Sequence, residues 1–215
     1  MKYAIAHNTS VVDSISSVVL FNLNSMAYIQ LNNQLPGITG LLENRPDTGD
    51  HIRTLTQVLL RGESTLTEME RELIATLVSY RNECAFCTSA HAATVKALGG
   101  DDALLDKVFH DPDNAPVTDK IKALLNIAGK VQKLGKEVTN EDVQRAKLHG
   151  ATDIEIHDTV LIAALFCLYN RYVDGLGTYK PEDPSYYQKL AQRLVTVGYM
   201  RPREGVIPIA ETTYR

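Results

Sequence analysis

The residues of this sequence that could do chemistry together lie in one short run, Glu83–His91. Cys84 and Cys87 are three positions apart at the expected start of a helix, so they can close a disulfide or hold two thiolates. The free amides and dipole of a first helical turn stabilise a thiolate, so we expect a thiol pKa to fall from about 8.5 to about 7 or below. His91 follows Cys87 by one helical turn and is within reach as a proton donor or acceptor. The spacing supplies a nucleophile, a resolving thiol and a base.

A polar stripe precedes this run. Glu72, Thr76, Ser79 and Glu83 recur at helical spacing beside an apolar face that leads to the cysteines. Glu72 is therefore a candidate general base, partly buried and connected to the thiols through water. The periodicity alone favours the alternative that the stripe is a solvated helix face.

The elements that must position these residues are predicted to be helices. Apolar side chains recur with helical periodicity from residue 66, and Thr65 or Thr67 is a candidate cap with a glutamate three positions later. The expected helices cover 66–78, 84–99, 101–109, 117–134, 140–148 and 153–173. No stretch alternates long enough for a strand, so the predicted fold class is all-α.

The chain is predicted to be a single domain over residues 1–215. Its parts are an irregular or helical lead-in at 1–60 with a loop over 44–50, a helical core at 66–180 that carries the cysteines, and a C-terminal arm at 198–215. The arm is expected to be extended, either mobile or laid on a neighbouring subunit.

Composition excludes several classes of function. The chain has 22 Lys and Arg against 26 Asp and Glu, a net charge of −4, and no basic block that would bind nucleic acid. Its longest apolar run, Val160–Leu168, is far shorter than the ~20 residues of a membrane span. Three cysteines are too few for a disulfide scaffold, and the N-terminus is a poor signal peptide, so we expect a cytoplasmic protein.

A resemblance adds to this interpretation. The sequence resembles the alkylhydroperoxidase AhpD and carboxymuconolactone decarboxylase superfamily, most of all its peroxidase-related branch with a CxxC pair. The residues that carry it are Arg71–Ala75, Val78, Ser79, Asn82, Cys84, Cys87 and His91, with looser matches at Pro36-Gly37, Arg45-Pro46 and Asn170-Arg171. It covers about residues 35–180 and implies an AhpD-like helical bundle that assembles into trimers or hexamers, although the residues themselves leave a dimer open.

The resemblance also implies a role for each site residue. Cys87 would be the peroxidatic thiolate that passes through a sulfenic acid, and Cys84 would resolve it as an intramolecular disulfide. His91 and Glu72 would form the proton relay. No cofactor or metal is implied. Well-known members have a histidine immediately before the second cysteine, where this chain has Phe86, so one polar partner is missing.

The function that the resemblance implies for these residues is thiol-dependent reduction of hydroperoxides, most of all organic ones. An external dithiol or thiol, such as a lipoyl or thioredoxin-like protein, would regenerate the site, and the protein would be a homo-oligomer.

Other functions stay open. The pair could serve general disulfide exchange or redox sensing without catalysis, and the superfamily also contains lactone decarboxylases that do not depend on the cysteine pair. A zinc site would need a fourth ligand besides Cys84, Cys87 and His91, and the candidates are His110, His149, His157 and Cys167. Cys167 is expected to be a buried, inert thiol, and His157 beside Asp158 is expected at the surface or as a helix cap.

Overall fold

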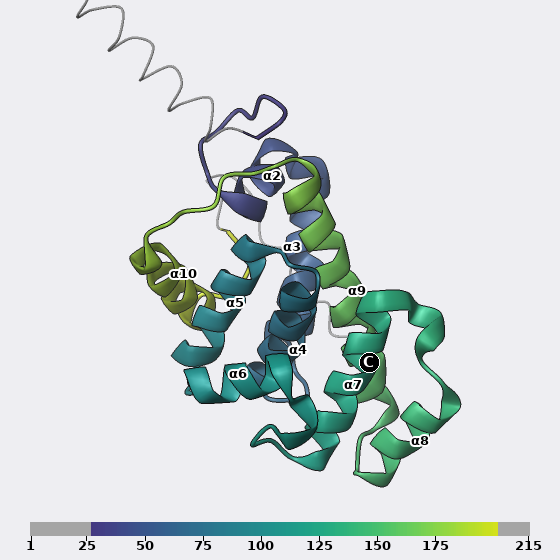
Figure 1. The fold of residues 1–215 in the computed structure, drawn as a ribbon. Coiled ribbons are helices and arrows are strands. Elements are labelled where there is room, and N and C mark those ends of the chain that lie inside the picture. The colour runs from purple at the N-terminus through teal and green to yellow at the C-terminus, as the bar shows by residue number, and fades with distance from the viewer. Residues whose placement is uncertain (1–26, 202–215) are drawn as a thin grey trace, which may run out of the picture.

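The computed structural model describes residues 27–201, which fold into helices without a strand (Figure 1). The helices are α2 (Gly37–Asn44), α3 (Pro46–Arg61), α4 (Glu68–Arg81), α5 (Ala85–Ala97), α6 (Asp102–His110), α7 (Asp119–Leu134), α8 (Asn140–Leu148), α9 (Asp153–Gly175) and α10 (Pro184–Thr196). Two short 3₁₀ turns lie at Pro112–Asn114 and Gly135–Glu137. The all-α prediction is confirmed.

No helix within residues 27–201 combines the length and the apolar character that crossing a bilayer requires. A single domain over residues 1–215 stays a prediction, because residues 1–26 of the lead-in and 202–215 of the arm lie outside the described part.

Helix starts follow from capping chemistry. Thr67 accepts a hydrogen bond from the amide of Glu70, whose carboxylate accepts one from the Thr67 amide, so α4 begins with a capping box. Thr152 and Glu155 do the same at the start of α9. These caps satisfy amides that lack partners in the first turn, and they place α4 to α9 within a few residues of the predicted boundaries.

The predicted loop over residues 44–50 is wrong, because α3 begins inside it at Pro46. Proline at the first helical position loses no hydrogen bond, and Asp47 in the first turn favours the positive end of the helix dipole. Proline also disfavours helical geometry in the preceding residue, so Arg45 separates α2 from α3 with an extended φ of −128°. Helix α10, likewise opened by a proline after a capping Asp183, had no predicted counterpart.

Helix α4 lies at the centre of the fold. It packs against α5, α7 and α9, and α10 lies along the outer side of α5 (Figure 1). Ile74, Leu77 and Val78 are fully buried there with Leu124 and Phe166 of the neighbouring helices. Each such side chain contributes roughly 1.5–3 kcal/mol by leaving water. The burial holds α4 and α5 in a fixed relation, and these two helices carry the predicted site residues.

The beginning of the C-terminal arm folds back on its own chain. Gly198 has a φ of +82°, a conformation that favours glycine, and reverses the chain after α10. The Tyr199 amide then donates to Oε1 of Gln57 on α3 at 2.7 Å. Residues 198–201 therefore lie against α3 of their own chain, and residues 202–215 lie outside the described part; a contact of the arm with a neighbouring subunit stays a prediction.

Candidate active site

Cys84 and Cys87 lie at the start of α5 as predicted. Cys84 is the N-cap residue and Cys87 lies in the first turn; both are free thiols and both are buried. The chain enters α5 through Glu83, whose φ of +59° is unusual for a residue other than glycine. This turn lets the Cys84 amide donate to the carbonyl of Ser79 at 3.1 Å. It directs both cysteines into the protein.

The two thiols interact with each other rather than with solvent. The hydrogen bond to Cys84, together with burial, raises the pKa of the Cys87 thiol well above its ordinary value, although a bond to Asn170 acts in the opposite direction. The expected fall of a thiol pKa at the helix start is therefore wrong for Cys87. A neighbouring thiol and the loss of water outweigh the helix dipole. Cys87 rests as a neutral thiol and needs a base to react.

Asn170 is a site residue to which the sequence interpretation gave no role. Its side chain donates to Oγ of Ser79 at 3.2 Å and accepts from Asn82 at 2.8 Å, so its orientation beside Cys87 is fixed. Asp174, one turn further along α9, accepts a hydrogen bond from Cys84, and burial raises its carboxyl pKa. Helix α9 therefore lines the thiol pair with polar groups.

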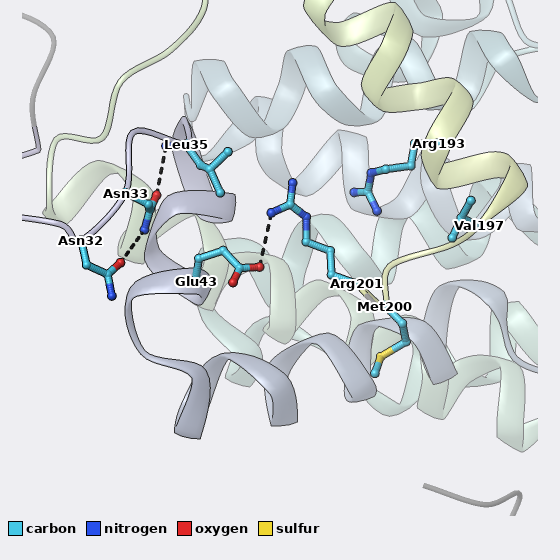
Figure 2. A pocket seen from close by; sticks show the side chains of 8 residues that line it. All are labelled: Asn32, Asn33, Leu35, Glu43, Arg193, Val197, Met200 and Arg201. Atoms are coloured by element: carbon cyan, nitrogen blue, oxygen red, sulfur yellow. Dashed lines mark hydrogen bonds and ion pairs between the residues drawn. The ribbon is translucent and has the colours of Figure 1, made fainter. Parts of the chain in front are cut away.

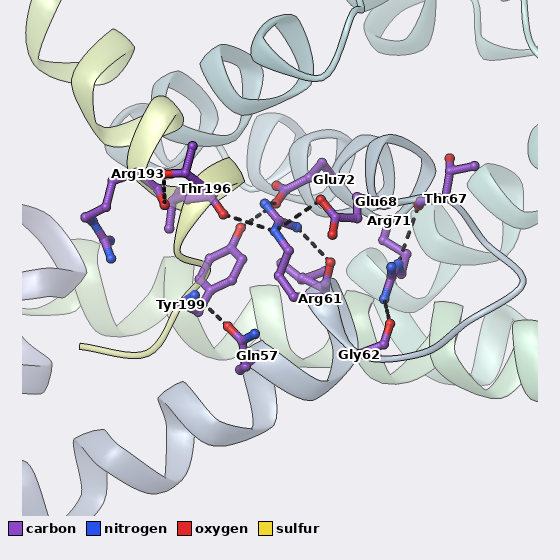
Figure 3. A network of polar contacts seen from close by, with 12 residues as sticks. Gln57, Arg61, Gly62, Thr67, Glu68, Arg71, Glu72, Arg193, Thr196 and Tyr199 are labelled. Atoms are coloured by element: carbon purple, nitrogen blue, oxygen red, sulfur yellow. Dashed lines mark hydrogen bonds and ion pairs between the residues drawn. The ribbon is translucent and has the colours of Figure 1, made fainter. Parts of the chain in front are cut away.

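Glu72 is fully buried on α4 and has three partners, of which Figure 3 labels Arg61 and Tyr199. Its carboxylate accepts hydrogen bonds from Nδ1 of His91 at 2.7 Å, from Nη2 of Arg61 at 2.6 Å and from the Tyr199 hydroxyl at 2.5 Å. Burial opposes ionisation, but the charges of His91 and Arg61 and these hydrogen bonds outweigh it, so the pKa of Glu72 lies below its usual value. Glu72 is an ionised carboxylate inside the protein.

The alternative of a solvated polar stripe is therefore wrong for most of its members. Glu72, Thr76 and Ser79 are all fully buried, and only Glu83 is exposed. Thr76 satisfies its hydroxyl by donating to the carbonyl of Glu72 at 2.6 Å, the usual way in which a threonine is buried in a helix. Glu72 is fully buried, whereas partial burial was expected, and it contacts His91 directly; its expected connection to the thiols through water stays a prediction.

His91 is buried between aromatic rings. Phe166 meets it edge-on at 4.6 Å between ring centroids, and the Tyr199 ring stacks beside it at 6.2 Å. The bond from Nδ1 to Glu72 fixes the ring and leaves Nε2 as the nitrogen that can exchange a proton with a substrate. Arg61 also lies 5.0 Å from the centre of the Tyr199 ring, a cation–π contact that ties Tyr199 to the same group.

A cavity of about 60 Å³ adjoins this group; Ala90 and His91 of α5 line it, together with Tyr169 and Tyr199. At 100° per residue, Cys87 falls between Ala90 and His91 around the helix. Burial raises the pKa of Tyr169 to about 12, and the nearby Cys87 adds to this rise. No hydrogen bond joins Cys87 directly to His91 among the described residues. The cavity thus gives a small molecule access to His91, and Cys87 lies beside this face of α5 without lining the cavity itself.

Phe86 takes no part in polar contacts. A Cβ on Gly37, whose φ is +55°, would lie 2.4 Å from the Phe86 ring, so the ring packs directly on this glycine. The Tyr187 ring meets it at 6.0 Å. An aromatic side chain therefore closes the site here, at the position that resemblance associates with a histidine.

The remaining candidates lie apart from the site. Cys167 is only half-buried, contrary to the expectation of burial. Its sulfur accepts a hydrogen bond from the side-chain Nδ2 of Asn82 at 3.6 Å. His157 is exposed beside Asp158, as expected. Within residues 27–201, no three His, Cys, Asp or Glu side chains are placed to hold a metal ion together.

Two functional residues had no signal in the sequence interpretation. Arg61 ends α3, and Tyr199 comes from the arm 127 positions after Glu72. Neither has a local pattern with the cysteines, because the contacts arise from the packing of α3 and the arm on α4.

Comparisons with known proteins bear on the family and the fold. Residues 46–129 match the carboxymuconolactone decarboxylase family. A comparison with curated proteins gives no significant match. Among solved structures, an uncharacterized peroxidase-related protein from a Silicibacter species is 22% identical, with a TM-score of 0.65 over 87% of this chain and 93% of its own.

Two further structures share the fold. An uncharacterized peroxidase-related protein from Ralstonia eutropha, described as an alkylhydroperoxidase AhpD core, is 25% identical, with a TM-score of 0.65 over 88% of this chain and 95% of its own. A protein of unknown function from Agrobacterium tumefaciens, linked by its name to AhpD and antioxidant defence, is 20% identical, with a TM-score of 0.58 over 64% of this chain and 93% of its own. The chain therefore shares its fold with AhpD-like, peroxidase-related proteins, and its residues 46–129 are similar to the carboxymuconolactone decarboxylase family.

Proposed function

We propose that this protein is a thiol-dependent hydroperoxide reductase of the CxxC-bearing, peroxidase-related branch. The observation that carries the proposal is a buried pair of free thiols one helical turn from a histidine that a buried carboxylate orients. Peroxidase-related neighbours and the family match support the same class of activity. The arrangement has the parts that thiol catalysis needs, which are a nucleophile, a resolving thiol and an oriented base.

The first step consumes the peroxide. His91 accepts the Cys87 proton through Nε2, and the thiolate sulfur attacks the terminal peroxide oxygen. The O–O bond breaks, the alkoxide takes the proton back from His91 and leaves as an alcohol, and Cys87 becomes a sulfenic acid. Glu72 stabilises the imidazolium that exists between the two transfers.

The second step closes the disulfide. The Cys84 sulfur attacks the sulfur of the sulfenic acid and releases water, so that ROOH and two thiols give ROH, H₂O and one disulfide. The contact already present between the two thiols supports this pairing. Two electrons from an external dithiol then reopen the disulfide.

The burial of the thiols bears on the reductant. Cys84 is 0% and Cys87 is 3% exposed, so a folded thioredoxin-like protein would have to displace part of the wall to reach them. A slender dithiol such as a dihydrolipoyl group needs less displacement. We therefore favour a lipoyl partner, and the same burial disfavours general exchange with protein disulfides.

The proposal also covers the oligomeric state and the location of the protein. Leu55 and Val58 are exposed one turn apart on α3, and Val197 is exposed at the end of α10. Exposed apolar side chains of this kind support self-association, and we propose a homo-oligomer, a trimer or hexamer, in the cytoplasm.

The test is peroxide consumption by the full chain with dihydrolipoamide as reductant. The wild-type protein is expected to consume cumene hydroperoxide, and Cys87→Ser is expected to lose this activity. Cys167→Ser is the matched control, because it also removes one thiol but lies apart from the pair, and it should behave as the wild type. Equal rates for wild type and Cys87→Ser would refute the proposal.

A further inference from the structure

Three arginines from different parts of the chain gather around the cavity beside His91. Arg53 comes from α3, Arg193 from α10 and Arg201 from the returning arm, and all three line the cavity. The protein as a whole carries a net charge of −4, so this concentration of positive charge is local.

The acidic residues nearby do not balance this charge. Glu43 accepts from Arg53 at 2.8 Å and from Arg201 at 3.3 Å, and Asp50 also pairs with Arg53 at 3.3 Å. Arg193 donates to the carbonyl of Gly198 at 3.2 Å and has no carboxylate within ion-pair distance among residues 27–201. One guanidinium charge is therefore left without an anion.

The surroundings of Arg193 disfavour a positive charge that has no anion beside it. Burial, with the charges of Arg201 and Arg53, lowers the pKa of Arg193. Like charges held close together in a partly buried site favour the binding of an anion. A planar guanidinium binds a carboxylate through two parallel hydrogen bonds, so this is the anion that fits it well.

Two of these arginines also line a larger hollow beside the inner cavity. Arg193 and Arg201 also line an open pocket of about 650 Å³, together with Leu35, Val197 and Met200. Figure 2 shows the Arg193 side chain extending toward that of Arg201, whose guanidinium group is directed at Glu43. An amphipathic molecule can therefore place an acid group on the arginines, apolar atoms in the hollow and a small group in the cavity by His91.

We propose that Arg193 and Arg201 form a carboxylate-binding site, and that the preferred hydroperoxides are organic acids held there with the peroxide group toward His91. The second part rests on the proposed peroxidase function. The first part is a binding property and holds or fails by itself.

Calorimetry tests the binding site without any turnover. Octanoate is expected to bind the full chain roughly ten- to a hundredfold more tightly than octanol, the range expected for hydrogen bonds to a charged group. Arg193→Gln should remove this preference. Lys189→Gln, which removes one exposed positive charge from the same helix, should keep it. Equal binding of octanoate and octanol to the wild type would overturn the carboxylate site.

Kinetics test the substrate class. Linoleic acid hydroperoxide and its methyl ester differ only in the acid, and we expect the wild-type kcat/KM to be roughly ten- to a hundredfold higher for the acid. In Arg193→Gln this ratio should approach one. A merely structural role of Arg193 would lower both rates and keep the ratio, and that result, or a wild-type ratio of one, would overturn the assignment of the substrate.

The two proposals fail in distinguishable ways. If neither hydroperoxide is consumed while octanoate binding depends on Arg193, the peroxidase function and the substrate assignment are refuted and the carboxylate site stands. If both hydroperoxides are consumed at equal rates and octanoate does not bind, the function stands and the site is refuted.

Discussion

The carboxylate of Glu72 lies 2.7 Å from Nδ1 of His91, although the two residues belong to different helices and are 19 positions apart. Arg61 and Tyr199 hold the same carboxylate from two further segments. The pair is thus fixed by the packing of α3, α4, α5 and the returning arm, and it gives the imidazole one orientation.

Replacing Glu72 by glutamine should slow peroxide reduction by roughly 10²–10⁴-fold, because His91 loses the anion that stabilises its protonated form. The measurement is the rate of cumene hydroperoxide consumption. Arg61 would keep only its longer ion pair with Glu68, at 3.5 Å, and the loss of its close partner would also destabilise the fold. The double variant Arg61→Met, Glu72→Gln removes both charges and should regain thermal stability without regaining activity; recovered activity would contradict the role of Glu72.

Tyr199→Phe should shift the acidic limb of the pH–rate profile to higher pH. The Tyr199 hydroxyl donates to Glu72 and lowers the pKa of that carboxyl, so its removal raises the pKa, and Glu72 becomes protonated at a higher pH than in the wild type. The profile of kcat/KM against pH measures the shift. Tyr179→Phe, which alters a half-exposed tyrosine, is the control. If the acidic limb of the profile lies at the same pH in Tyr199→Phe as in the wild type, ionisation of Glu72 does not determine that limb.

Alkylation of Cys87 should be slow at pH 7 and should still be rising above pH 9, because the bond to Cys84 and burial raise its pKa. Cys84→Ala removes that partner and should move the curve to lower pH. Peptide mass spectrometry after timed treatment with iodoacetamide gives the rate for each cysteine. A plateau for Cys87 near pH 7 in the wild type would contradict the raised pKa.

Glu155→Gln should destabilise the fold at neutral pH by roughly 2–3 kcal/mol. Glu155 is 2% exposed, and its pKa lies at about 2, since bonds from Lys120, Thr152 and Thr65 outweigh the cost of its burial. A depressed carboxyl pKa stabilises the fold above the unfolded value near 4.5 and loses this effect as the pH falls toward 2.

Urea unfolding at pH 7 and at pH 2.5 measures this difference. The difference in the free energy of unfolding between wild type and Glu155→Gln should be large at pH 7 and much smaller at pH 2.5. Glu141→Gln changes an exposed glutamate on α8 and should show little effect at either pH. A gap of equal size at both pH values would mean that the charge of Glu155 does not stabilise the fold.

The helical core could be predicted from the sequence because its signals are local. The apolar spacing from residue 66 and the cap at Thr67 lie within α4 itself. The start of α3 was hidden because Asn44–Asp50 reads as a loop, although a proline there can open a helix. Helices that begin at a clear capping residue were predicted. Helix α3 was not, because the residues at its start are typical both of a loop and of a proline-initiated helix.

Spacing alone predicted the site only within one helix, and it offered Glu72 of the preceding helix as a candidate base without showing what it contacts. Cys84, Cys87 and His91 share α5, and their spacing shows that they lie together. The burial of Glu72 depends on α3 and the arm, and the raised pKa of Cys87 depends on its contact with Cys84 inside the core. Contacts between distant segments set the charge state of each group, and no local pattern encodes them.

The central claim is that peroxide oxidises Cys84 and Cys87 as a pair. The most direct measurement is the intact mass of reduced, chelator-treated protein that is exposed, or not, to one equivalent of cumene hydroperoxide and is then alkylated in denaturant, where every remaining thiol is accessible. The account predicts that two of the three thiols no longer alkylate, that peptide mapping assigns the loss to Cys84 and Cys87, and that Cys167 still reacts. Full alkylation of all three thiols after peroxide would contradict it.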